Sequence, residues 1–117
     1  MAAQLRLQLL GKPTLYLDEI AVTGFTSAKV MALMIYLAVT ARPHTRDALA
    51  TLLWSQSADD AEAKTNLRQA LANLRKLGLA SFLHIERESV GIDKQTDITT
   101  DVAQLHSLAT QPIDPDN

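Results

Sequence analysis

The chain has 117 residues, of which 47% are hydrophobic, with a formal net charge of −2 and no cysteine. This length fits one small domain with room for the start of another, and the apolar fraction is ample for a packed core. The slight negative charge is not that of a general polyanion binder, so any contact with nucleic acid must come from a local basic patch. The lack of cysteine excludes disulfides, thiolate metal sites and cysteine nucleophiles.

The sequence predicts neither a secretory leader nor a membrane segment. Its first residues show no charged leader followed by a long apolar stretch. The most apolar run, from Val30 to Val39, is shorter than the roughly 20 residues that cross a bilayer. We therefore expect a cytoplasmic protein with no membrane partner.

The N-terminal segment carries the alternation typical of a small β-sheet. Residues 5–9 alternate leucine with polar side chains, as in a half-buried strand. A Gly-Lys-Pro turn signal at 11–13 separates them from a second alternating segment at 15–17, and a short apolar segment follows at 20–22. This pattern predicts an antiparallel meander.

Two helices are predicted next. The first begins at Thr26 or Ser27, either of which suits an N-cap, and runs to about Ala41, since a proline two residues later prevents its extension. It is apolar nearly all round, as expected of a central helix that packs against more than one element. The second begins at the N-cap Thr45 and ends near Trp54, which fits the core better than a role in stacking on DNA.

The most informative segment is a third helix, predicted from the acidic residues at 59–62 to Gly78. Leucines at 67, 71, 74 and 77 form an apolar stripe at helical spacing, and residues 64–85 include four basic side chains and no acidic one. The side chains away from the stripe are small or carry long donors, as reading a DNA groove requires. They are Thr65, Arg68, Gln69, Ala72, Asn73 and Lys76. A solvated amphipathic helix is the alternative.

The remaining chain predicts a β-hairpin and a connecting segment. Residues 82–86 and 90–93 are two short strands around Arg87-Glu88-Ser89. Residues 97–100 are expected to lead into a short amphipathic helix that contains Val102, Leu105 and Leu108. Residues 111–117 contain two prolines and no core candidates, which is typical of a linker.

The predicted order of sheet, three helices and hairpin defines an α+β winged helix-turn-helix, with an N-terminal antiparallel sheet, a three-helix core and a C-terminal β-hairpin wing. Six segments carry a more specific likeness: LRLQLLG at 5–11, SAK at 27–29, RPHTRDAL at 42–49, LLW at 52–54, NLRQALANLR at 66–75 and DVAQL at 101–105. In these segments the chain resembles the N-terminal DNA-binding domain of the SARP/BTAD transcriptional activators, a branch of the OmpR/PhoB-type winged helices.

The resemblance implies binding to duplex DNA upstream of a promoter, with the third helix in the major groove and the hairpin near the minor groove. Such domains are usually one part of a longer regulator and commonly bind direct repeats as two protomers, head to tail. RNA polymerase is the further partner implied for an activator. We therefore expect residues 1–96 to be the DNA-binding domain, and residues 97–117 to be a connecting helix and linker toward a BTAD-like domain.

Arg68 and Gln69 are the foremost candidates for contacts with bases, because arginine pairs with guanine and glutamine with adenine through two hydrogen bonds each. Thr65 and Asn73 are the other base candidates. Phosphate contacts, which position a protein without specifying sequence, are expected from Arg46, Lys64, Arg75 and Lys76. Arg87 in the hairpin would reach the minor groove. For each residue the alternative is a solvated side chain, and for Arg75 also pairing with an acidic residue.

Two features depart from the family pattern. The hairpin lacks the Gly-Tyr pair of many family wings, and Glu86 and Glu88 flank Arg87, which weakens the expected contact with phosphates. Ala72 occupies a position of the third helix where a longer polar side chain could have contacted a base.

Other function classes find less support. The chain has no Gly-rich phosphate loop, no serine-nucleophile motif and no paired acids with supporting bases, so we expect neither an enzyme nor a cofactor. His44, His84 and His106 are too scattered to predict a metal site. A winged helix used for protein–protein contact or dimerisation, without DNA affinity, remains the main alternative, which the net negative charge favours. A small-molecule sensor is a second alternative, although no polar cluster points to one.

Overall fold

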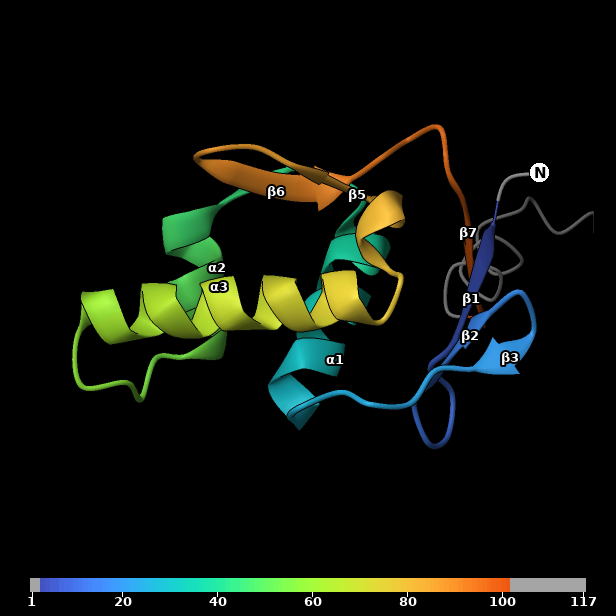
Figure 1. Cartoon of the computed structure of the whole chain (residues 1–117), viewed down its shortest axis with the longest axis horizontal. Coiled ribbons are helices and arrows are strands. Elements are labelled where there is room, and N and C mark those ends of the chain that lie inside the picture. Colours follow the sequence, from blue (N-terminus) through green and yellow to red (C-terminus); the bar gives the residue numbers. More distant parts are fainter. Residues whose placement is uncertain (1–2, 102–117) are drawn as a thin grey trace, which may run out of the picture.

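The alternating leucines near the N-terminus form the inner face of a four-stranded sheet in the computed structural model, which describes residues 3–101 (Figure 1). The strand order is β3-β2-β1-β7, and the strands are β1 (Gln4–Gln8), β2 (Thr14–Leu17), β3 (Ile20–Ala21) and β7 (Asp97–Thr100). β2 pairs antiparallel with both β1 and β3, which confirms the predicted meander. Leu5, Leu7 and Leu15 are fully buried, so this face of the sheet covers one side of the core.

The sequence pattern assigns no strand to residues 97–100, which complete the N-terminal sheet. They form β7, which pairs parallel with β1, so the sheet is mixed rather than purely antiparallel. Asp101 fastens the end of β7, because its carboxylate accepts hydrogen bonds from the amides of Leu9 and Leu10 at 2.8 and 2.9 Å. A domain boundary after residue 96 would therefore remove a strand from the sheet. The expected helix from Val102 and the linker at 111–117 lie outside the described residues.

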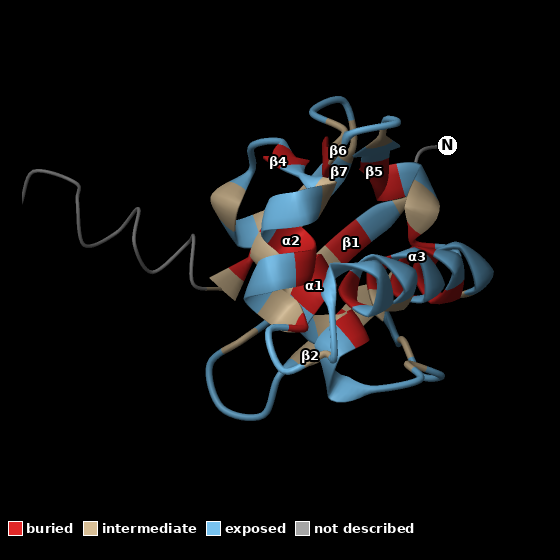
Figure 2. Cartoon of the chain, turned by 90° about the vertical axis from the view of Figure 1, so that its left-hand side faces the viewer, coloured by how far each residue is buried: buried red, intermediate tan, exposed pale blue. Residues whose placement is uncertain are grey.

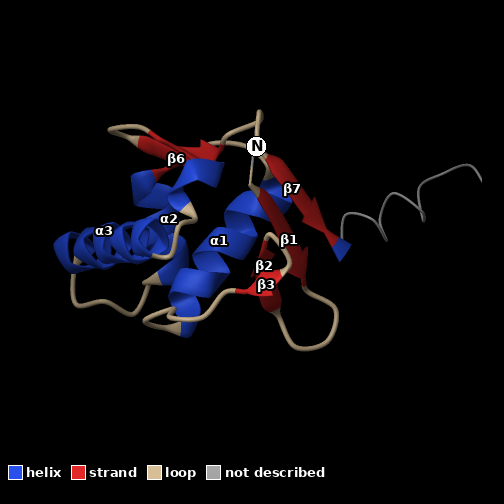
Figure 3. Ribbon diagram, turned by 45° about the vertical axis from the view of Figure 1, so that its right-hand side comes forward, coloured by secondary structure: helices blue, strands red, loops and turns tan. Residues whose placement is uncertain are grey.

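The helices occupy the middle of the fold. Within residues 3–101 the α-helices are α1 (Ala28–Thr40), α2 (Arg46–Leu53) and α3 (Asp60–Lys76). α1 lies between α3 and the N-terminal sheet (Figure 3), and it also contacts α2, β6 and β7. The prediction of a central helix is thus confirmed. Trp54, just after α2, is 8% exposed and belongs to the core, as expected.

Local signals fix the helix ends where the sequence predicts them. Thr45 is the N-cap of α2, and its side chain accepts a hydrogen bond from the amide of Ala48 at 3.1 Å. Asp59 caps α3 in the same way, with the amide of Glu62 at 2.7 Å. Beyond α3, Gly78 has a φ of +81°, a left-handed conformation that glycine adopts without strain. The start and end of α3 are therefore encoded locally.

The predicted hairpin is confirmed and gains a third strand. After a short 3-10 helix, η1 (Ala80–Phe82), the strands β5 (Leu83–Ile85) and β6 (Ser89–Ile92) pair antiparallel. A third strand, β4 (His44–Thr45), pairs antiparallel with β6. It has only two residues, and the sequence pattern does not predict it. This small sheet ties the segment between α1 and α2 to the hairpin, so the hairpin lies over α2 and α3 (Figure 1).

His44 is buried in β4. Its Nε2 lies 2.8 Å from the hydroxyl of Thr40, which itself donates to the carbonyl of Tyr36. The imidazole also packs on the Tyr36 ring, with a centroid distance of 4.8 Å. Burial, together with the nearby charge of Arg42, lowers the pKa of His44. The neutral form of His44 is therefore part of the folded state.

We predict that protonation of His44 destabilises the fold. Its pKa is lower in the folded state than in the unfolded chain, so the unfolded state binds the proton more tightly. The resulting stabilisation is fully present above the unfolded pKa of about 6.5 and is lost as the pH falls below it. Urea unfolding between about pH 7 and pH 5 should show a steeper loss of unfolding free energy in the wild type than in His44→Gln. Equal slopes would contradict this role.

Candidate nucleic-acid interface

The exposed face of α3 gathers most of the predicted site residues. Figure 2 shows the exposed residues along the outer side of the helix and the buried ones where the helices meet. Ala63, Leu67, Ala70, Leu71 and Leu74 face the core. The predicted residues that are exposed together on the opposite face are Lys64, Thr65, Arg68, Gln69, Arg75 and Lys76. Nine residues are predicted to contact DNA, and α3 presents these six of them to solvent. The other three are Arg46, Asn73 and Arg87.

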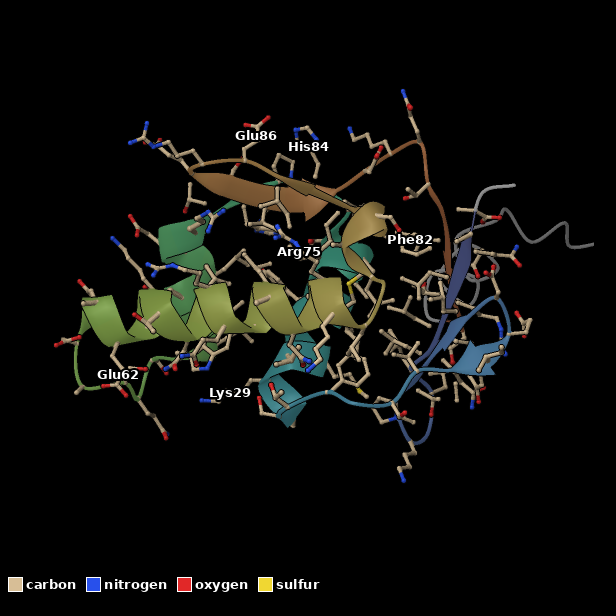
Figure 4. The ribbon with its side chains drawn as sticks, in the orientation of Figure 1. Lys29, Glu62, Arg75, Phe82, His84 and Glu86 are labelled. Carbon is tan, nitrogen blue, oxygen red and sulfur yellow. The ribbon has the colours of Figure 1, made fainter. Side chains whose placement is uncertain are left out.

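This exposed face has two flanks. Lys64 and Arg68, four residues apart on neighbouring turns, line a groove toward α2 and the hairpin. Figure 4 shows Arg75 reaching from α3 toward the same side. Gln69 and Lys76 line a hollow on the other flank, next to the segment before α1. The basic side chains are therefore spread across the width of the face rather than concentrated at one point.

The groove on the first flank, which we call the α2–α3 groove, has a volume of about 460 Å³ and combines residues from β4, α2, α3 and the hairpin turn. It is lined by Thr45, Arg46, Asp47, Lys64, Leu67, Arg68, Arg87 and Glu88. Four of these side chains are cationic and two are anionic. The structure thus brings two more predicted residues, Arg46 and Arg87, to the flank of α3, although they lie far from it in sequence.

Arg46 fastens the hairpin turn to the start of α2. Its guanidinium donates to the carbonyl of Glu86 from Nε at 3.2 Å and from Nη2 at 2.9 Å. Its backbone amide donates to the carbonyl of Glu88 at 2.9 Å. Because the guanidinium has five N–H donors, some remain for the predicted phosphate contact. The primary role of Arg46 in the structure is to position the turn that carries Arg87.

Lys64 already has an anionic partner. Its Nζ lies 3.0 Å from the Oδ1 of Asp47, and the two side chains are 52% and 75% exposed. The hydrogen bond to Asp47 raises the pKa of Lys64, so the ammonium stays charged. An ion pair this exposed contributes little stability and opens readily. Within residues 3–101, no ion pair engages the other cations of this face, namely Arg68, Arg75, Lys76 and Arg87.

The expectation that Asn73 lies on the exposed face is wrong, since it is only 8% exposed. Its Oδ1 accepts hydrogen bonds from the amide of Thr26 at 2.9 Å and from the Thr26 hydroxyl at 3.3 Å, and its Nδ2 donates to the carbonyl of Gly24 at 3.2 Å. Buried alanines, Ala63 and Ala70, extend the core face beyond the leucine stripe toward Asn73. Asn73 therefore ties α3 to the segment before α1 and presents no group to DNA.

The hairpin turn carries Arg87 between two exposed acids, Glu86 and Glu88. On the outer side of the hairpin, Glu86 pairs with His84, and their side chains lie together in Figure 4 with Nε2 and Oε1 2.7 Å apart. Sequence reasoning identified Arg87 but missed Asp47, because the partner of Asp47 lies on another helix and no local spacing signals the pair.

Two further observations bear on the site. Between residues 3 and 101, no group of three or more histidines or acidic residues is placed to hold a metal ion, and no helix is both long and apolar enough to cross a bilayer. A comparison with models of protein families and one with curated protein sequences both find no match.

We predict that Asn73→Ala lowers the free energy of unfolding by about 1–3 kcal/mol, because it leaves the amide of Thr26 and the carbonyl of Gly24 without their partner. The matched control is Gln69→Ala, one turn earlier on the exposed face of α3. This variant should change the free energy of unfolding by less than about 0.5 kcal/mol. Urea unfolding of both variants measures the difference. Equal effects would mean that Asn73 is not a structural tie.

Proposed function

We propose that this chain is a winged helix-turn-helix domain that binds duplex DNA and regulates transcription, with α3 in the major groove and the β5–β6 hairpin as the wing. The observation that carries the proposal is the basic exposed face of α3 in a chain whose net charge is −2. An α-helix with its side chains is about 10–12 Å wide, which suits a major groove of about 12 Å.

The side chains of this face divide into two roles. Arg68 and Gln69 have the donors and acceptors that pair with guanine and adenine edges, and Thr65 beside them can bond to either. Lys64, Arg75 and Lys76 lie around them and suit phosphate contacts that position the helix. Ala72 is exposed on the same face, and its small side chain permits close approach to the bases and suits contact with a thymine methyl group.

The hairpin supports the same docking from a second element. Arg46 holds its turn beside α2, so Arg87 lines the α2–α3 groove and can reach the next groove of the DNA. The likeness to the SARP/BTAD activators, carried by the segments quoted above, leads us to propose further that two protomers bind direct repeats and that RNA polymerase is a partner.

One observation favours the alternative of a protein-docking module without DNA affinity. Glu86 and Glu88 are exposed at the tip of the hairpin and would repel phosphates there. The two functions differ in their response to salt: phosphate contacts weaken steeply as salt rises, whereas contacts between apolar surfaces do not.

We predict that selection from a random duplex library enriches a consensus and that the enriched duplex binds with a steep salt slope. In anisotropy titrations, Arg68→Ala should relax specificity at one base pair and cost about 1–3 kcal/mol. Lys76→Ala should weaken binding to all duplexes alike and reduce the salt slope by about one.

Lys12→Ala is the matched control, because it removes the same charge from the exposed turn between β1 and β2, away from α3. It should leave affinity unchanged within about twofold, since interactions beyond a Debye length are screened. Wild-type behaviour of both α3 variants would overturn the proposal. Salt-insensitive association with itself or with another protein, without enrichment of any duplex, would establish the docking alternative.

A further inference from the structure

The α2–α3 groove contains an acidic residue that the proposed function does not use. Asp47, in the first turn of α2, lies among the cations of this groove and bonds to Lys64 across the two helices. A carboxylate in this position faces any phosphate that approaches Lys64. It therefore opposes the binding that the rest of the groove favours.

We infer that Asp47 holds Lys64 in an ion pair and so restrains the sequence-independent affinity of this face for DNA. The inference rests on the proposed function. Phosphate contacts supply affinity for every duplex, whereas base contacts distinguish one sequence from another. Because the restraint acts on a phosphate contact alone, it lowers the affinity for every duplex alike and leaves the difference between sequences to the base contacts.

The geometry makes Asp47 a restraint rather than a block. Both partners are more than half exposed, so the pair is weak enough for a phosphate to displace the carboxylate. Once displaced, Asp47 stays in the groove as an uncompensated charge and attracts a cation from solution. This uptake offsets the counterions that Lys64 releases from DNA, so Lys64 adds little to the salt slope while Asp47 is present.

The chain offers a matched control for this pair. Arg6 and Glu19 form another exposed ion pair, with Nη2 and Oε2 2.9 Å apart. It lies on the N-terminal sheet, at the other end of the molecule from the start of α3 (Figure 1). Glu19→Gln changes the net charge as Asp47→Asn does and also frees a cation, but away from the groove. Comparing the two variants separates a local effect from one of net charge.

The test is anisotropy titration of a scrambled duplex with wild type, Asp47→Asn and Glu19→Gln over a range of salt concentrations. Asp47→Asn should bind about three- to tenfold more tightly at low salt, with a salt slope steeper by about one. Glu19→Gln should stay within about twofold of the wild type. In a Lys64→Gln background, Asp47→Asn should have no more effect than Glu19→Gln, because the cation that it frees is absent.

A second measurement keeps the inference testable if Asp47→Asn fails to fold. Lys64→Gln alone should weaken binding to the scrambled duplex less than Lys76→Gln does, because the carboxylate of Asp47 already offsets the charge of Lys64. Equal losses, or equal effects of Asp47→Asn and Glu19→Gln, would overturn the inference while leaving the proposed function intact. A wild type that shows no salt-dependent binding to any duplex would overturn the proposed function, and this inference with it.

Discussion

The packing of α3 on the central helix α1 is the constraint on which the rest of the structure depends. One face of α1, which carries Val30, Leu33 and Leu37, is buried, and the helix contacts α3, the hairpin sheet and the N-terminal sheet. This burial fixes the rotation of α3 about its own axis. The rotation in turn determines which α3 side chains meet solvent, so the composition of the basic face follows from the packing of the core rather than from charge.

The chain has no overall excess of positive charge, and four cationic side chains are gathered at one groove instead. The α2–α3 groove draws cations from α2, α3 and the hairpin turn, yet it also contains Asp47 and Glu88. Arg46 positions the hairpin through hydrogen bonds to two backbone carbonyls, from its guanidinium to Glu86 and from its amide to Glu88, so this placement does not depend on ion pairs. In the function we propose, a rigid and only moderately basic surface leaves discrimination to the few side chains that reach the bases.

The features that the sequence predicted are those encoded within a few residues. Helical spacing and the caps Thr45 and Asp59 located α1, α2 and α3, and two short strands around Arg87-Glu88-Ser89 located β5–β6. The features it missed join distant segments: β7 fills the free edge of β1, β4 adds to β6, and Asp47 on α2 meets Lys64 on α3. Asn73 was misplaced because a stripe defined by leucines alone omits the buried alanines beside it.

The parallel pairing of β1 with β7 has a mechanical consequence. The two strands run in the same direction at opposite ends of the described chain, and the Asp101 carboxylate locks the last residue of this pairing to the amides after β1. A force that pulls residue 3 and residue 101 apart would therefore act along the strands and load their hydrogen bonds together in shear, not one after another as in unzipping. The sheet would then transmit tension between these two points without opening the core that holds α3.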